Sequence, residues 1–176
     1  MGTPKALLSY QGESFISRLC RLLRPWCQPV ILVWGHAEVT LELPGVILVR
    51  NPDPELGQLS SLQCGLRALD PTQSVLYTPV DHAALRPETL AKLVTAFETQ
   101  PYPVVQPRYQ GRRGHPVLVR PAIAAQLLRL PPSATARHAV HAPGVAIGYV
   151  DVPDPAVVHD VDTPADYQAL LTGGEP

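Results

Sequence analysis

Apolar residues follow two different spacings along the chain, and their alternation predicts an α/β fold. Stretches with apolar side chains every three or four residues predict helices, at residues 14–24, 57–69, 87–97, 121–130, 134–141 and 164–171. Short apolar runs predict strands, at 30–34, 46–49, 74–80, 104–105, 116–119 and 145–152, with a short extended piece at 159–162. The runs VILVW (30–34) and VILV (46–49) are typical of strands buried on both faces. Strands alternating with helices indicate a largely parallel sheet covered by helices on both faces.

A sheet of this kind binds its ligand at the carboxyl ends of its strands. The residues expected there are Gly35, Asn51, Asp81 and the pair Asp160 and Asp162. Charged residues are only 16% of the chain. Acidic groups at these positions therefore predict a site for a cation and a phosphate.

Composition narrows the possible functions. The chain has 176 residues, enough for one domain (1–176) with a substantial core. Its net charge of -1, without blocks of like charge, argues against a nucleic-acid or membrane partner. No apolar run approaches the roughly 18 residues of a membrane helix, and the first residues do not resemble a signal peptide. The three cysteines form no paired framework, so we expect a cytoplasmic protein.

Several segments, in order and spread over the whole chain, resemble the motifs of one family. They are MGTPKALL (1–8), NPDPELGQLSSLQCGL (51–66), TPVDHAAL (78–85), QGRRGHPVLV (110–119) and HDVDTPADYQAL (159–170). Together they resemble the MobA-like nucleotidyltransferases, in particular the CTP:molybdopterin cytidylyltransferases. The resemblance implies a three-layer α/β/α Rossmann-like nucleotidyltransferase fold with a mostly parallel sheet. It also implies that the family's first strand and its LAAGxSxR loop are absent, since the chain starts at the methionine that follows them.

The resemblance implies Mg²⁺ as the cofactor, and it assigns roles to three residues. Asp81 and Asp160 are the candidate metal ligands, in keeping with the one or two carboxylates that Mg²⁺ commonly takes. Asp81 is also a candidate catalytic residue, although a turn before Pro87 would explain it too. Lys5 is the candidate catalytic cation on the triphosphate, with a solvated terminal lysine as the alternative. Asp162 is better explained as the cap of the last helix.

Two further groups are assigned to the substrates. Asn51, Gly57, Ser61 and Leu62 resemble the segment that binds the nucleotide; a plain Asn-Pro turn before a helix is the alternative. The loop with Arg112, Arg113 and His115 is the candidate acceptor-binding site, because arginine holds phosphate through a planar fork; an exposed hairpin is the alternative. His138 and His141 lie one helical turn apart, but without a third ligand they are better explained as surface residues.

The hypothesis that follows is an enzyme that transfers CMP from CTP to molybdopterin and releases pyrophosphate. Its partners would be a nucleoside triphosphate and a phosphorylated small-molecule acceptor. Guanylyl transfer, or activation of a sugar phosphate, would use the same scaffold. The alternative from another class is a catalytically impaired nucleotide-binding remnant, because loss of a central strand would leave its two neighbours without backbone partners.

Overall fold

The helices and strands lie close to where the apolar spacing predicts them. The computed structural model describes residues 4–35, 43–131 and 133–172. Its helices are α1 (Phe15–Leu23), α2 (Gln58–Arg67), α3 (Pro87–Thr99), α4 (Pro121–Arg129), α5 (Arg137–Val140) and α6 (Pro164–Thr172), with 3-10 turns η1 (Lys5–Leu7), η2 (Pro54–Leu56), η3 (Val80–His82) and η4 (Pro155–Val157). Its strands are β1 (Ser9–Tyr10), β2 (Glu13–Ser14), β3 (Val30–Trp34), β4 (Val46–Arg50), β5 (Val75–Tyr77), β6 (Val104–Tyr109), β7 (Arg112–Arg113), β8 (Val117–Val119) and β9 (Ile147–Asp151). The predicted α/β class is confirmed.

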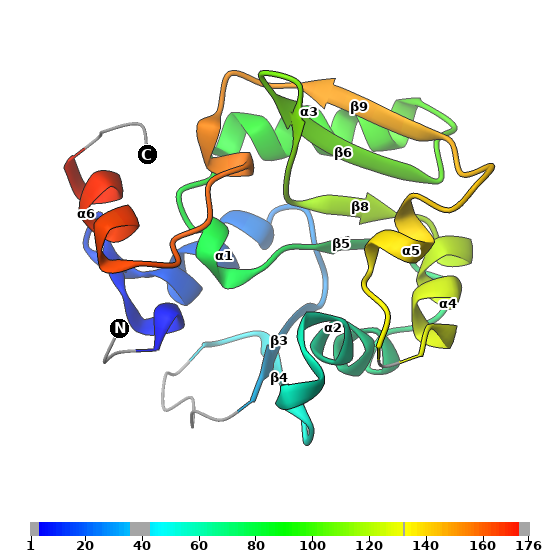
Figure 1. Cartoon of the computed structure of the whole chain (residues 1–176), viewed down its shortest axis with the longest axis horizontal. Helices are drawn as coiled ribbons and strands as arrows, with labels where there is room; N and C mark the ends of the chain where they lie inside the picture. The colour runs from blue at the N-terminus through cyan, green and yellow to red at the C-terminus, as the bar shows by residue number, and fades with distance from the viewer. Residues whose placement is uncertain (1–3, 36–42, 132, 173–176) are drawn as a thin grey trace.

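The described strands pair in three separate groups (Figure 1). β1 and β2 form a small antiparallel hairpin, and β3 and β4 form a parallel pair. The remaining strands form a five-stranded sheet in the order β5-β8-β6-β7, with β9 also paired to β6. β9 is parallel to β6, whereas β8 is antiparallel to both β5 and β6. The larger sheet is therefore mixed, and β3 and β4 stand apart from it.

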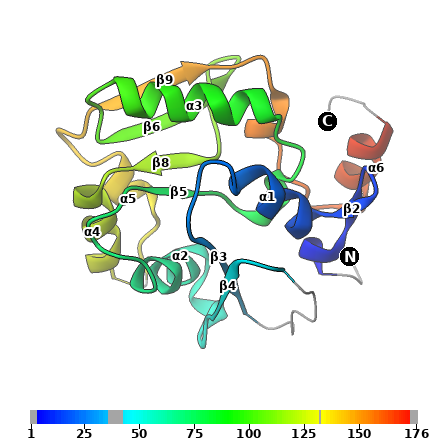
Figure 2. The same cartoon turned by 180° about the vertical axis from the view of Figure 1, so that it is seen from behind.

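Alternating side chains of the larger sheet pack into cores on its two faces. Val105 and Leu118 pack with Leu93 and Phe97 of α3, which covers one face (Figure 2). The neighbouring residues in these strands point the other way, as the two-residue period of a strand requires. They join α2, α4 and α5 in a second core that contains Leu59, Leu66, Val104, Val117, Val119, Ile123, Leu127 and Val140. Helices therefore cover both faces of this sheet, as predicted.

A third core connects the N-terminal helix to the turns that carry the site. Phe15 and Leu19 of α1 pack with Leu85, Val157 and residues near them. Helix α1 begins at Ser14, whose hydroxyl accepts a hydrogen bond from the Ser17 amide, as an N-cap does. This core holds η3 and η4, which lie far apart in the sequence, against the same helix.

Several details differ from the sequence predictions. β6 extends to Tyr109 rather than ending at residue 105, and β1, β2 and β7 are not predicted. β3 and β4 are not buried on both faces: only Val30 is buried in β3, and Ile47 and Leu48 of β4 are exposed. β5 spans three residues rather than 74–80, since Pro79 cannot donate a ladder hydrogen bond. Residues 159–162 form no strand. No helix in the described part of the chain is long and apolar enough to cross a membrane.

Candidate active site

Acidic side chains from two distant segments meet beside the N-terminal turn. The Lys5 Nζ lies 3.4 Å from the Asp81 Oδ2 and also forms an ion pair with Asp162. Asp81 and Asp160 each present a carboxylate oxygen to one place, and with a nitrogen of His82 these atoms all lie within 4.8 Å of one another. Partial burial lowers the pKa of Lys5, but the carboxylates of Asp162 and Asp81 outweigh it and raise that pKa above 10.5. We call Asp81, His82 and Asp160 the acidic triad.

Asp81 has an incompletely satisfied carboxylate. Its side chain is 13% exposed, and its Oδ1 is buried without a hydrogen-bond partner among the described residues. A buried carboxylate oxygen normally has a donor or a cation beside it. The arrangement therefore has the electrostatic character of a cation-binding position.

His82 is the member of the triad that sequence reasoning missed. Its side chain is 2% exposed; the ring Nδ1 lies 2.9 Å from the carbonyl of Ala156, and the Nε2 lies 3.0 Å from the Asp160 Oδ1. A carbonyl only accepts, so the Nδ1 carries a hydrogen. The Nε2 is then the ring nitrogen that faces the carboxylate of Asp160. The signal available in the sequence was a histidine directly after Asp81 in the segment TPVDHAAL (78–85).

The turns that carry the triad are not strand ends. Asp81 lies in η3, a few residues after β5, and Asp160 follows η4 instead of a strand at Val158. Pro153 and Pro155 lack amide hydrogens, which explains why this segment turns rather than extends. Asp81 and Asp160 lie close together as predicted, but 3-10 turns rather than strand ends bring them there.

The last helix is capped differently from the prediction. The Thr163 hydroxyl accepts a hydrogen bond from the Asp166 amide at 3.2 Å, and the Asp166 carboxylate accepts from the Thr163 amide at 2.7 Å. This reciprocal pair is a capping box. The prediction that Asp162 caps this helix is therefore wrong, and its carboxylate pairs with Lys5 instead.

His115 lies next to the triad. Its ring centre is 5.0 Å from that of His82, and its Nδ1 is buried without a hydrogen-bond partner among the described residues. Burial, together with the nearby His82, lowers the pKa of His115 to about 4, so the imidazole is neutral at pH 7. Gly114 allows this approach, because a Cβ there would lie 1.8 Å from the Val157 carbonyl oxygen.

The two arginines of the same loop are exposed and differ in their contacts. Arg112 donates to the carbonyl of Val158 at 3.4 Å, close in sequence to Asp160. Arg113 lies 3.2 Å from the Nδ1 of His141 and stacks near the ring of Tyr149. His141 thus faces a cation, which does not support a metal-binding role for it.

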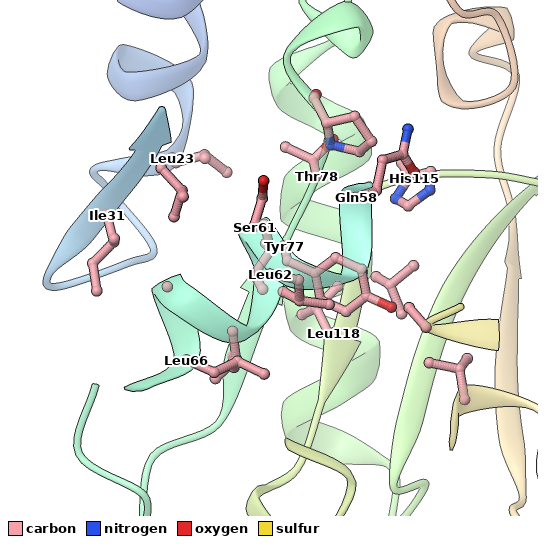
Figure 3. Close-up of a pocket in the computed structure, with 18 of the residues that line it drawn as sticks. Leu23, Ile31, Gln58, Ser61, Leu62, Leu66, Tyr77, Thr78, His115 and Leu118 are labelled. Carbon is pink, nitrogen blue, oxygen red and sulfur yellow. The ribbon is translucent and has the colours of Figure 1, made fainter. Parts of the chain in front are cut away.

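Asn51 anchors its own loop. Its side chain is buried, and its Nδ2 donates to the hydroxyls of Ser60 at 2.8 Å and Ser61 at 3.0 Å. Its Oδ1 accepts from the Asp53 amide. Gly57, with a φ of 88°, forms the turn where α2 begins. Ser61 and Leu62, on the next turn of α2, line a large cavity that also reaches His115 (Figure 3). The nucleotide-binding role of this segment stays a prediction.

The fold is that of an α/β domain, and solved structures of nucleotidyltransferases share it. A model of the MobA-like NTP transferase domain matches residues 1–158. The chain therefore belongs to the MobA-like NTP transferase family.

Known relatives agree with this assignment. The molybdenum cofactor cytidylyltransferase of Escherichia coli (strain K12) is 23% identical over 173 residues, which are 95% of this chain and 86% of that protein. The structure of Rv0371c from Mycobacterium tuberculosis H37Rv is 26% identical with a TM-score of 0.81, covering 98% of this chain and 90% of the other. A second structure of Rv0371c, a complex with manganese, has a TM-score of 0.78 at 26% identity, covering 97% of this chain and 93% of the other.

Proposed function

We propose that the protein transfers CMP from CTP to molybdopterin, with release of pyrophosphate. The observation that carries the proposal is the acidic triad beside Lys5, because nucleotidyl transfer requires positioning and charge neutralisation rather than covalent catalysis. The similarity to a molybdenum cofactor cytidylyltransferase supports this choice of nucleotide and acceptor.

Asp81 and Asp160 would hold Mg²⁺, which favours oxygen ligands. The unpartnered Oδ1 of Asp81 fits such an ion, and the contact from His82 positions the more exposed carboxylate of Asp160. When bound, the ion would neutralise charge on the phosphates. Lys5 then exchanges its contacts with Asp81 and Asp162 for a phosphate oxygen. Transition metals also accept a histidine nitrogen beside two carboxylates, so each metal-binding experiment should compare Mn²⁺ with Mg²⁺.

Arg112, Arg113 and His115 would bind the acceptor. The arginines can donate paired hydrogen bonds to a phosphate. His115, neutral at pH 7, lies between this loop and the triad, where it can donate or accept one hydrogen bond. Asn51, Gly57, Ser61 and Leu62 would shape the nucleotide side, with Asn51 fixing the backbone of its loop from within.

A pyrophosphate-release assay with CTP, GTP and ATP, each with molybdopterin, tests the proposal. We expect CTP to be preferred, and Asp81→Asn to abolish release while the far-ultraviolet circular dichroism is unchanged. The control is Asp151→Asn, which alters an exposed carboxylate paired with Arg108. Retained activity in Asp81→Asn would remove this residue from the mechanism. A preference for GTP, or turnover only with a sugar phosphate, would replace the proposed substrates.

A second candidate function is nucleotide binding without turnover. It is favoured by the separation of β3 and β4 from the larger sheet. Binding of CTP with no pyrophosphate release under any metal would support this candidate instead.

A further inference from the structure

One wall of the large cavity carries cations. Its members Arg112, Arg113, Arg137 and His141 come from the loop around β7, from α5 and from the residue that follows α5. Among the described residues that line the cavity, Glu98 of α3 is the one acid. Because α3 and α5 pack on opposite faces of the larger sheet, this acid is not part of the wall. The wall therefore has a positive potential that no lining carboxylate offsets.

Two arginines of this wall converge on His141. The Nη1 of Arg113 lies 3.2 Å from the Nδ1 of His141. Arg137 lies one helical turn before His141, and its carbonyl accepts a hydrogen bond from the His141 amide. Partial burial, Arg113 and Arg137 all lower the pKa of His141, so the ring is neutral at pH 7. A guanidinium group only donates, so the Nδ1 accepts and the Nε2 carries the hydrogen of the neutral ring.

The charges of Arg113 and Arg137 have no counter-charge in the described part of the chain. Neither arginine forms an ion pair there. Arg113 also lies directly opposite Arg108 in the β6-β7 ladder, a like-charge pairing that destabilises a sheet. The Arg108 charge is offset by Asp151, which accepts two hydrogen bonds from it at 2.9 and 2.8 Å. A bound anion would supply the missing charge beside Arg113 and Arg137.

We propose that Arg113, Arg137 and His141 form a binding site for an oxyanion of the phosphate class. The two guanidinium groups and the Nε2 hydrogen of the imidazole would donate to different oxygens. A tetrahedral anion presents oxygens in several directions and suits three donors from three side chains, whereas a carboxylate presents two oxygens in one plane. The anion is either a phosphate of the acceptor or free inorganic phosphate. The inference rests on the proposed function only for the first of these sources.

Titration with inorganic phosphate, without metal or nucleotide, tests the site. The His141 ring is followed by NMR, and the affinity of each variant is measured by calorimetry. Arg137→Gln and His141→Asn should each weaken phosphate binding by about tenfold or more, because each removes one donor to a charged group. The matched controls are Arg129→Gln, an exposed arginine outside the cavity, and His138→Asn, an exposed histidine of the same helix. Both controls should bind phosphate as the unchanged chain does.

The expected result is a shift of the His141 resonances that saturates with phosphate, together with a rise in the pKa of His141, since a bound anion favours the protonated ring. Sodium chloride at the same ionic strength should not produce this shift. A chloride effect as large as that of phosphate would overturn the proposal, and so would equal affinities in Arg137→Gln and Arg129→Gln. Phosphate binding that is lost only in Lys5→Gln would place the anion beside the acidic triad and would also overturn it.

Steady-state kinetics with the same variants identify the source of the anion. If the acceptor supplies it, Arg137→Gln should raise the KM for molybdopterin about tenfold, and free phosphate should compete with molybdopterin. If free phosphate is the ligand, that KM should stay unchanged and phosphate should alter kcat instead. Both results retain the site. A chain that binds phosphate through Arg137 and His141 but releases no pyrophosphate would contradict the proposed function alone.

Discussion

Asp154→Asn probes the network that fixes the turn behind the site. The Asp154 side chain is 2% exposed, and its carboxylate accepts hydrogen bonds from the Arg86 amide at 3.0 Å, the Thr89 hydroxyl at 2.7 Å and the Ala156 amide at 3.1 Å. Asparagine replaces one acceptor oxygen with an NH₂ group. At least one buried donor then faces another donor.

The expected loss of stability follows from these contacts. A hydrogen bond to a charged group contributes about 1.5–3 kcal/mol, and a buried donor left unpaired costs about 1–3 kcal/mol. The carboxylate also lies at the N-terminus of α3, where negative charge stabilises the helix. We expect the free energy of unfolding to fall by about 3 kcal/mol, which corresponds to a fall in Tm of roughly 6–12 °C in a domain of this size.

Urea unfolding followed by circular dichroism measures this change. Glu98→Gln, an exposed carboxylate near the other end of α3, is the matched control and should change the stability by less than about 0.5 kcal/mol. A loss in Asp154→Asn no greater than that of the control would refute the reasoning. The turn would then be held by the apolar contacts of Val157 rather than by the buried carboxylate.

Three further predictions concern the loop beside the triad. Because burial lowers the pKa of His115 to about 4, the unfolded chain binds a proton near pH 6.5 that the folded chain does not. The free energy of unfolding should therefore fall by up to about 3 kcal/mol between pH 6.5 and pH 4. In His115→Gln this part of the pH dependence of the unfolding free energy should be absent. Replacing Arg112 and Arg113 by glutamine should raise the KM for the acceptor about tenfold or more and leave that for CTP unchanged, in steady-state assays. Gly114→Ala should lower stability by about 1–3 kcal/mol in urea unfolding, since its Cβ would overlap the Val157 carbonyl.

The sequence predicts the larger sheet and its helices well, because burial there follows simple periods. Val104 and Val105 alternate between two cores, and Leu93 and Phe97 of α3 pack in the same core as Val105. The sequence predictions are wrong about burial in β3 and β4, where few described residues pack against the strands. β3 and β4 read as fully buried strands, yet Ile47 and Leu48 are 45% and 46% exposed, because no residues of the described chain cover them.

For the candidate site, too, the sequence predicts some features correctly and misses others. Motif order predicted that Asp81 and Asp160 lie together, which the structure bears out in geometry, while their role as metal ligands stays a prediction. His82 could not be ranked from the sequence, because its importance depends on the Ala156 carbonyl that orients its ring. The position of Asp162 just before Thr163 and Pro164 predicts a helix cap, whereas its partner in the structure, Lys5, lies at the opposite end of the chain.

Divalent-metal binding tests the central claim most directly. Titration calorimetry with Mg²⁺ and with Mn²⁺, in the presence of CTP, should detect one ion per chain. Asp81→Asn and Asp160→Asn should each abolish binding, His82→Ala should weaken it by about 10–100-fold, and the control Asp151→Asn should leave it unchanged. Binding that is unaffected by either Asp81→Asn or Asp160→Asn would contradict the account.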